Sequence, residues 1–241
     1  MQSIKALTFD TGGTLLDWHS GFRDAFGAAG ARHGVTRDWP QLANELRHRA
    51  LGAMINLGEN GPPAYNFDQA HRFTLDTLLT EHDLDMFDEA DRHAIAWDAP
   101  HAFKCWPDCA EGLSAIRQRY IVASFTILSY RLIIDTARAN GLTWDAVLSC
   151  EGFGVYKILP EAYAKAAKAL QLEPHECLMV ACHAHDLDAA RAVGFRTALV
   201  RRPEEWGPEA YRPEPVRSAL ETTYDYDITV DDFIELSKAL Q

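Results

Sequence analysis

An aspartate stands at the end of a short apolar run near the N-terminus, in the stretch ALTFDTGGTLLDW at residues 6–18. A carboxylate in that position can attack carbon or phosphorus and form a covalent ester, so we expect Asp10 to be a nucleophile. Gly13 allows the chain to turn sharply after it, and Thr14 can hydrogen-bond within the turn. Gly12 occupies the place where many such enzymes carry a second acid. The alternative is that Asp10 only caps the end of a strand.

Three further polar residues lie at or just after predicted strand ends. Thr126 ends the run YIVASFT, Lys157 lies in the loop before a helix that begins at Pro160, and Asp186 follows CLMVAC by four residues. In an open parallel sheet, ligands bind at the carboxyl ends of the strands. We therefore expect these side chains to lie close to Asp10.

The elements that position these residues alternate between strand and helix. Strands are predicted at 4–9, 120–126, 146–150, 177–182, 196–201 and 226–230, and helices at 21–33, 39–56, 66–81, 88–97, 110–119, 129–140, 160–170, 186–193 and 231–240. Turns are expected at Gly30–Gly34 and Leu57–Pro63, and Arg202–Pro215 is predicted to be a surface loop. This order indicates an α/β fold, a Rossmann-like doubly wound parallel sheet with an inserted all-helical cap. We assign residues 1–17 and 99–241 to the core and 18–98 to the cap.

Composition restricts the function classes. The chain has 241 residues and a formal net charge of −12, which argues against general binding to nucleic acid or to an anionic membrane. No apolar run reaches the roughly 18 residues that a membrane span requires. The N-terminus leads straight into a strand without a signal-like segment, so a cytoplasmic protein is expected. The five cysteines are expected to be reduced structural thiols.

Taken together, these four loops resemble those of the haloacid dehalogenase superfamily, and most of all its type II 2-haloacid dehalogenases. Asp10 matches the nucleophile of the D-x-x-G-T pattern in DTGGT. Thr126 matches the small hydroxyl that would orient a substrate oxygen. Lys157, in VYKILPEAY, would keep Asp10 ionised, and Asp186, in VACHAHDLDAARAVGF, would orient Lys157 or position the hydrolytic water. For Asp186 a helix-capping role is the alternative, and for Thr126 an ordinary strand-end threonine.

The same resemblance implies substrate-binding residues in the cap and core. Arg47, in LANELRHRA, aligns with an arginine that would bind the substrate carboxylate or receive the halide. Phe67, in YNFDQA, aligns with an aromatic of the halide pocket, and Tyr163 matches a tyrosine of the dehalogenase branch. The alternatives are a solvated helix arginine, a cap-core phenylalanine and a core tyrosine.

Several positions depart from the superfamily's patterns. Its phosphatases place an acid at the position of Gly12 to protonate the leaving group, and another at the position of Ala181 to hold magnesium. A halide needs neither. Thr126 is normally followed by Asn-Gly, whereas here Ile127 and Leu128 follow, so Ile127 occupies the place of an amide expected to help hold the halide.

His183 replaces an asparagine of the dehalogenase branch. The resulting A-x-H-x-x-D pattern resembles a subgroup that includes fluoroacetate-acting enzymes, in which His183 would contact halide or water; a structural histidine is the alternative. Cys182, His183 and His185 are too weak a pattern to assign a metal site, with His185 expected in a solvated loop. We therefore expect no metal.

The sequence is compatible with three functions. The first is a hydrolytic 2-haloacid dehalogenase that needs no cofactor and acts on a small anionic carboxylate. The second is a phosphatase or other hydrolase of the same fold, for which Mg²⁺ would be required. The third is a binding protein whose halide site has decayed. Many relatives dimerise, so a homodimer is a possible assembly.

Overall fold

The computed structural model describes residues 4–55, 65–213 and 224–241. The predicted turn at Leu57–Pro63, the expected helix end at Asn56 and the last two residues of the expected loop Arg202–Pro215 lie outside the described residues.

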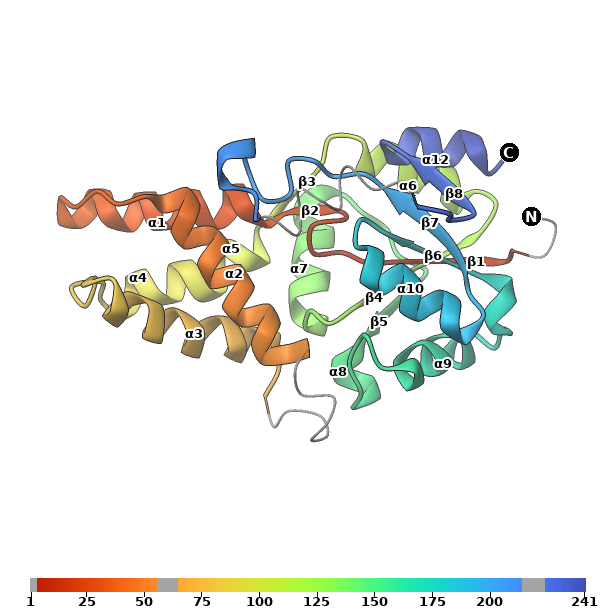
Figure 1. Ribbon diagram of the computed structural model, residues 1–241, viewed down its shortest axis with the longest axis horizontal. Helices are drawn as coiled ribbons and strands as arrows, with labels where there is room; N and C mark the ends of the chain where they lie inside the picture. Colours follow the sequence, from red (N-terminus) through yellow and green to blue (C-terminus); the bar gives the residue numbers. More distant parts are fainter. Residues whose placement is uncertain (1–3, 56–64, 214–223) are drawn as a thin grey trace.

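A six-stranded parallel sheet forms the centre of the fold (Figure 1). Its strands are β1 (Ala6–Phe9), β4 (Ile121–Thr126), β5 (Ala146–Ser149), β6 (Cys177–Ala181), β7 (Arg196–Val200) and β8 (Ile228–Val230). Their order across the sheet is β5-β4-β1-β6-β7-β8, and every neighbouring pair is parallel. Strand order reverses beside β1, which lies between β4 and β6. The predicted doubly wound α/β fold is confirmed.

Helices cover both faces of the sheet, and nearly all residues of its central strands β1, β4 and β6 are therefore buried. They are α6 (Cys109–Arg117), α7 (Tyr130–Asn140), α8 (Cys150–Phe153), α9 (Pro160–Ala169), α10 (Ala184–Val193) and α12 (Phe233–Ala239), with 3₁₀ turns at Pro174–Glu176 and Glu209–Tyr211. Helices α6 and α12 pack against each other, and α9 packs against α10.

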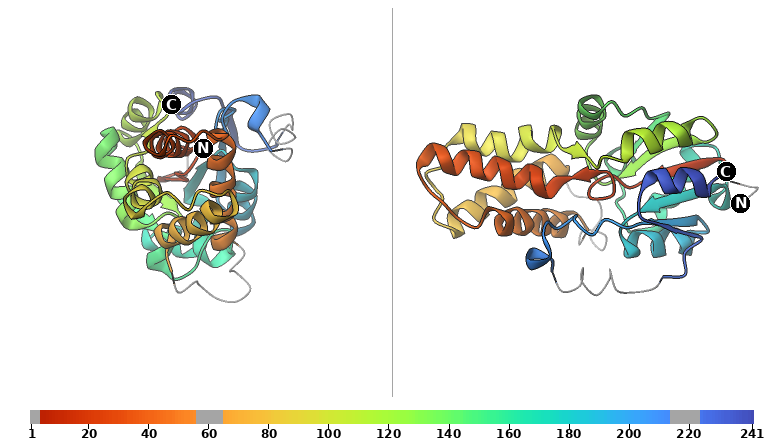
Figure 2. Two further views of the ribbon diagram at one scale, coloured as in Figure 1. Left: turned by 90° about the vertical axis from the view of Figure 1, so that its left-hand side faces the viewer. Right: turned by 90° about the horizontal axis from the view of Figure 1, so that it is seen from above.

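A helical layer lies at one end of the molecule (Figure 2). It consists of α1 (Trp18–His33), α2 (Trp39–Ile55), α3 (Phe67–Glu81), α4 (Glu89–His93), a π-helical turn (Ala94–Asp98) and α5 (Ala99–His101). This layer occupies the position expected for the cap. The last helix extends beyond the predicted boundary at residue 98, and the division at 17/18 and 98/99 stays a prediction.

Short elements differ from the sequence-based expectation. A two-stranded antiparallel ribbon of β2 (Leu16–Asp17) and β3 (Lys104–Cys105) joins the core to the helical layer, and strands of two residues are too short to show alternation. The run expected as a strand through Cys150 ends at Ser149, whose side chain caps α8. His185 lies in α10 rather than in a loop, with its side chain exposed.

Hydrogen bonds hold the helical layer onto the core. Ser129, at the N-terminus of α7, donates to the buried carboxylate of Asp68 in α3, with 2.6 Å between the oxygens. Asn66 donates to Glu151 of α8, and Asn44 of α2 donates to backbone oxygens of the segment after β7. These hydrogen bonds, some of them fully buried, favour a closed arrangement of the helical layer over the carboxyl edge of the sheet.

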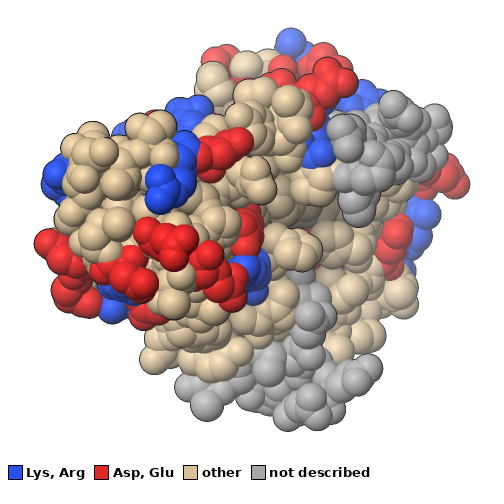
Figure 3. All heavy atoms as spheres, turned by 60° about the vertical axis from the view of Figure 1, so that its left-hand side comes forward, with Lys and Arg blue, Asp and Glu red and all other residues tan. Residues whose placement is uncertain are grey.

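Charged side chains of both signs intermingle on the face drawn in Figure 3, where acidic atoms are the more extensive. This agrees with the net charge of −12. Across residues 4–55, 65–213 and 224–241, no helix combines the length and the apolar character that crossing a membrane would take.

One buried histidine of the helical layer is expected to make the free energy of unfolding depend on pH. His71 is fully buried between Phe22 and Phe67, and neither ring nitrogen has a hydrogen-bond partner among the described residues. Burial lowers the pKa of His71 to about 3, assisted by the Arg47 charge and His101 and opposed by Asp68. In the unfolded chain His71 is protonated once the pH falls below about 6.5, whereas in the folded state it stays neutral down to a much lower pH.

Stability contributed by neutral His71 is expected to be complete above pH 6.5 and to fall as the pH drops toward 3, by about 4 kcal/mol in all. His71→Leu should flatten this part of the curve of unfolding free energy against pH, measured by urea denaturation at several pH values. His93→Gln, at an exposed histidine, is the control and should leave the curve unchanged. Equal acid sensitivity in His71→Leu and the native chain would contradict the assignment.

Candidate active site

A cavity of about 330 Å³ opens where strand order reverses, at the carboxyl edge of the sheet. Asp10 follows β1, Thr126 ends β4, and Cys182 and His183 follow β6. All four line the cavity, together with Lys157. This is the edge at which open parallel sheets bind their ligands.

Asp10 is buried, and both of its carboxylate oxygens have partners. Thr14 Oγ1 donates to Asp10 Oδ2 at 2.7 Å and itself accepts from the backbone N–H of Cys182 at 3.0 Å. Lys157 Nζ lies 3.4 Å from Asp10 Oδ1, and His183 Nδ1 lies 3.2 Å from Oδ2. The turn after β1 therefore places the carboxylate between two cationic groups.

Lys157 joins Asp10 to a second buried carboxylate. Its Nζ lies 2.7 Å from Asp186 Oδ2, and the hydroxyl of Tyr163 donates to Asp186 Oδ1 at 2.5 Å. Asp186 lies in the first turn of α10, where the helix dipole favours its negative charge, but the N-cap position belongs to His183. Asp186 thus holds Lys157 in place rather than capping the helix.

Burial alone would raise the pKa of Asp10, because it disfavours the charged carboxylate. The Lys157 ammonium, His183 and the Thr14 hydroxyl outweigh burial and hold the pKa of Asp10 well below its usual range. In turn, burial would lower the pKa of Lys157, but Asp186 and Asp10 outweigh it and raise that pKa. The pair is therefore ionised at neutral pH.

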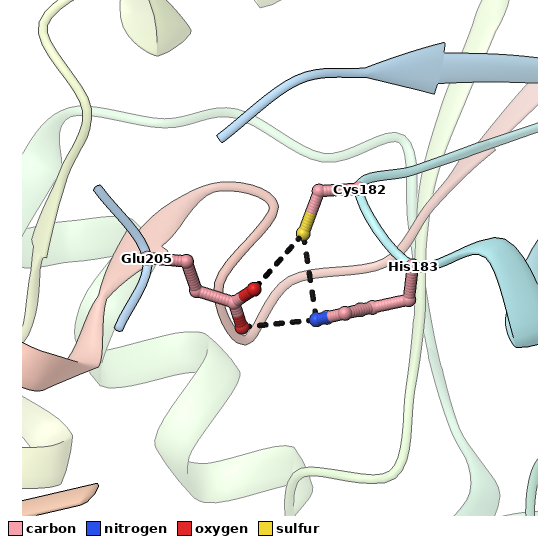
Figure 4. A group of neighbouring side chains, drawn as sticks. All are labelled: Cys182, His183 and Glu205. Carbon is pink, nitrogen blue, oxygen red and sulfur yellow. Dashed lines mark hydrogen bonds and ion pairs between the residues drawn. The ribbon is translucent and has the colours of Figure 1, made fainter. Parts of the chain in front are cut away.

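A second chain of polar contacts starts at His183 (Figure 4). Its Nε2 lies 2.9 Å from Glu205 Oε1, which also accepts from Trp18 Nε1 at 3.1 Å. Burial opposes protonation of His183, but the Cys182 sulfur and the carboxylates of Glu205 and Asp10 outweigh it and raise its pKa well above the ordinary value. His183 is therefore a cation that joins Asp10 to Glu205.

Arg47 reaches the cavity from α2 and is only 3% exposed. Its guanidinium lies over the rings of Trp18 and Phe67, 5.4 Å from each centroid. It forms no ion pair with any carboxylate in the described part of the chain, and its Nε there lacks a hydrogen-bond partner. A buried, unpaired cation facing a cavity is suited to an anionic ligand.

Gly12 makes room for this arginine. A Cβ atom at residue 12 would lie 2.6 Å from Arg47 Nη2, closer than such contacts permit. An aspartate at this position would have to displace the guanidinium. Gly13, at φ +91°, is held against Glu205 in the same way, since a Cβ there would lie 2.0 Å from Glu205 Oε1. The bare turn therefore accommodates two charged side chains.

The loop that follows β4 contributes apolar residues to the cavity. Thr126 Oγ1, at the end of β4, accepts hydrogen bonds from Thr11 Oγ1 at 2.8 Å and from the backbone N–H of Leu128 at 3.1 Å. Ile127 and Leu128 line the cavity. Ile127 thus gives the ligand an apolar wall where an amide was expected by resemblance.

The predicted site residues fall into two groups. Those that line the cavity are Asp10, Thr126, Lys157, Asp186, Arg47, Ile127 and His183. Thr14, Phe67 and Tyr163 do not line it; each is buried and holds one of the lining groups, namely Asp10, Arg47 and Asp186.

Glu205 was missed because the expectation of a surface loop at Arg202–Pro215 was wrong for its first part. Glu205 and Trp206 are buried and line the cavity. A signal for Glu205 was available, since it follows the end of β7 by a few residues, as Asp186 follows β6. The Pro- and Glu-rich composition concealed it.

The donor set beside Asp10 does not fit magnesium. This ion requires oxygen ligands in near-octahedral geometry. Gly12 and Ala181 supply none, both oxygens of Asp10 are directed at Thr14 and cationic groups, and both oxygens of Asp186 are bound by Lys157 and Tyr163.

Comparisons with known proteins agree with this geometry. Residues 4–194 match the sequence model of a family described as haloacid dehalogenase-like hydrolase. The chain is 28% identical to (S)-2-haloacid dehalogenase 4A of Burkholderia cepacia, covering 90% of each chain. It resembles the crystal structure of a defluorinating L-2-haloacid dehalogenase with a TM-score of 0.90 and 32% identity, covering 98% of this chain and 95% of the other. A second L-2-haloacid dehalogenase structure gives a TM-score of 0.88 and 34% identity, with 98% of each chain covered. Because the family model covers residues 4–194 and both structures are more than 30% identical over nearly the whole chain, this chain belongs to the haloacid dehalogenase-like hydrolases.

Proposed function

We propose that the protein is a hydrolytic dehalogenase of short 2-haloalkanoates. The observation that carries this proposal is the buried guanidinium of Arg47, which lines the same small cavity as Asp10 and has no ion-pair partner among the described residues. It can bind one carboxylate and so present the adjacent carbon to Asp10. The names of the relatives at 28–34% identity support the same substrate class.

In the first step Asp10 attacks the carbon that bears the halogen. A bond forms between a carboxylate oxygen and this carbon, and the halide leaves with the electron pair of the broken bond. Lys157 and His183 keep Asp10 ionised for the attack. The halide needs no proton to depart, which is consistent with glycine at position 12.

In the second step water attacks the carbonyl carbon of the Asp10 ester and releases a 2-hydroxy acid. His183, 3.2 Å from Asp10 and held at its other nitrogen by Glu205, is placed to take the proton of this water. Once Asp10 is esterified it is uncharged, so His183 can lose its proton to solvent before it accepts the one from water. One halide and one proton are released per turnover, and no cofactor is required.

A phosphatase is disfavoured by the same residues. It would need an acid at position 12, where Arg47 lies, and oxygen ligands that the site lacks. A decayed binding protein is disfavoured because the nucleophile, its cations and their buried partners are all in contact. Burying several charged groups costs desolvation free energy even when they are paired, and such clusters are typical of functional sites.

The test is a substrate panel with ion chromatography. Halide release is expected from (S)-2-chloropropionate or fluoroacetate, with and without a chelator at equal rates. No phosphate should be released from an aryl phosphate in the presence of magnesium. Chelator-sensitive phosphate release would overturn the proposal in favour of the phosphatase, and no turnover of any haloacid would favour the binding protein.

Gly12→Ala tests the carboxylate-binding role of Arg47. The new methyl group must displace the guanidinium, so KM for the haloacid is expected to rise about tenfold, with a smaller effect on kcat. Gly27→Ala in α1 is the matched control, since its Cβ would make only an ordinary contact of 3.7 Å with Trp39. Steady-state halide release measures both, and an unchanged KM in Gly12→Ala would contradict the assignment.

A further inference from the structure

A group of three side chains of different chemistry lies at one side of the cavity (Figure 4). Cys182 and His183 follow β6, and Glu205 follows β7, so three metal-ligating atoms come from two neighbouring loops. Their potential ligand atoms all lie within 4.8 Å of one another. In the sequence His185 stands close to Cys182 and His183, whereas in the structure the third potential ligand beside these two residues is Glu205.

We propose that Cys182, His183 and Glu205 form a binding site for a thiophilic divalent cation of the Zn²⁺ type, and that occupation of this site inhibits the hydrolase. The inhibition rests on the proposed function; the binding does not. Sulfur, nitrogen and carboxylate ligands suit Zn²⁺, whereas magnesium prefers oxygen alone.

The distances already approach those of a coordinated ion. Cys182 Sγ lies 3.4 Å from His183 Nε2 and 3.6 Å from Glu205 Oε2, and His183 Nε2 lies 2.9 Å from Glu205 Oε1. Tetrahedral coordination at ordinary zinc bond lengths separates its ligands by roughly 3.3–3.6 Å. Only the histidine–glutamate pair must therefore move apart, by a few tenths of an ångström.

The groups around the three ligands are also arranged as metal sites require. His183 directs its other nitrogen, Nδ1, to the Asp10 carboxylate, and Trp18 donates to Glu205 Oε1. A carboxylate behind a ligating histidine fixes its ring and raises its basicity. The cavity that the three residues line leaves space for a fourth ligand such as water.

Binding would exchange protons for the metal. The thiol of Cys182 and Nε2 of His183 each release one proton to solvent, while Nδ1 keeps its proton toward Asp10. A dication would then lie on the far side of His183 from Asp10. With the metal on Nε2 and a proton held on Nδ1, His183 could no longer accept the proton of the hydrolytic water. Halide release is therefore expected to fall as the site fills.

Cobalt(II) is a suitable probe, because a thiolate ligand produces a sulfur-to-metal charge-transfer band in the near ultraviolet. The native chain is expected to show this band at one equivalent of Co²⁺ and to lose it when Zn²⁺ is added. Zn²⁺ affinity, measured by isothermal titration calorimetry, should fall at least about tenfold in Cys182→Ala and in Glu205→Gln. Having two variants guards against one that fails to fold.

Cys105→Ala is the matched control, since Cys105 is the other partly exposed cysteine and lies near Cys109. It should retain the band. Absence of the band in the native chain, or its loss in Cys105→Ala instead of Cys182→Ala, would overturn the proposal.

Halide release by the native chain should be inhibited by Zn²⁺, and halide release by Cys182→Ala should be inhibited much less. Equal inhibition of both would overturn the inhibitory role. A chain that binds cobalt at Cys182 but turns over no haloacid would refute the proposed function and leave the metal site standing.

Discussion

Asp10→Asn is expected to lower kcat for halide release by about 10⁴-fold or more, because the variant lacks the carboxylate that forms the ester. The amide is nearly the same size as the carboxylate and can still accept the Thr14 hydrogen bond. Lys157 keeps Asp186 as its partner, and His183 keeps Glu205. The variant is therefore expected to fold, which circular dichroism and thermal unfolding can establish.

The matched control for this variant is Asp188→Asn. Asp188 is an exposed acid on α10 that accepts a hydrogen bond from Tyr226 and does not line the cavity. It is expected to retain activity near that of the native chain. A folded Asp10→Asn enzyme with more than a small fraction of native activity would show that Asp10 is not the nucleophile.

Lys157→Met is expected to have the second largest effect. Lys157 is buried, and its removal leaves Asp10 and Asp186 facing each other across an apolar side chain without their common cation. Breaking a buried ion pair in this way costs about 3–5 kcal/mol of folding free energy. Loss of this preorganised charge is also expected to lower kcat by about 10²–10³-fold.

The way in which pH changes the folding stability of Lys157→Met follows from the pKa of Asp10. Burial raises this pKa and Lys157 lowers it, so without Lys157 the carboxyl becomes a weaker acid. In the native chain the depressed pKa contributes stability above the unfolded value, and this stability is lost as the pH falls. In Lys157→Met that contribution shrinks, so the native and variant stabilities should converge toward acid pH. Lys168→Met, at an exposed lysine of α9, should change neither stability nor kcat appreciably.

The parts of the site that lie at strand ends were predictable from sequence. Asp10, Thr126 and Asp186 lie at or just after the ends of β1, β4 and β6, and the topology of a parallel sheet brings such residues to one edge. Lys157 was expected just after a strand, but α8 lies between it and β5. The cavity wall formed by Arg47 required the resemblance, because a helical arginine carries no local signal of its burial.

Other features depend on contacts between segments far apart in the chain. Glu205 is buried only because Trp18, His183 and the bare backbone of Gly13 meet it from three other segments. The role of Gly12 is likewise visible only from Arg47, which approaches it from the helical layer. The sequence showed that an acid was missing at position 12, whereas the structure shows that the vacant position is filled by a cation.

The central claim is that Asp10 forms an ester that water then opens at the aspartate carbonyl. A single turnover in H₂¹⁸O, with enzyme in excess over (S)-2-chloropropionate, tests it most directly by mass spectrometry of product and protein. The account predicts that the hydroxyl of the first lactate formed contains ¹⁶O from Asp10, and that ¹⁸O appears in the Asp10 carboxylate. Lactate carrying ¹⁸O in its hydroxyl after that single turnover, with Asp10 unlabelled, would show direct attack by water and contradict the account.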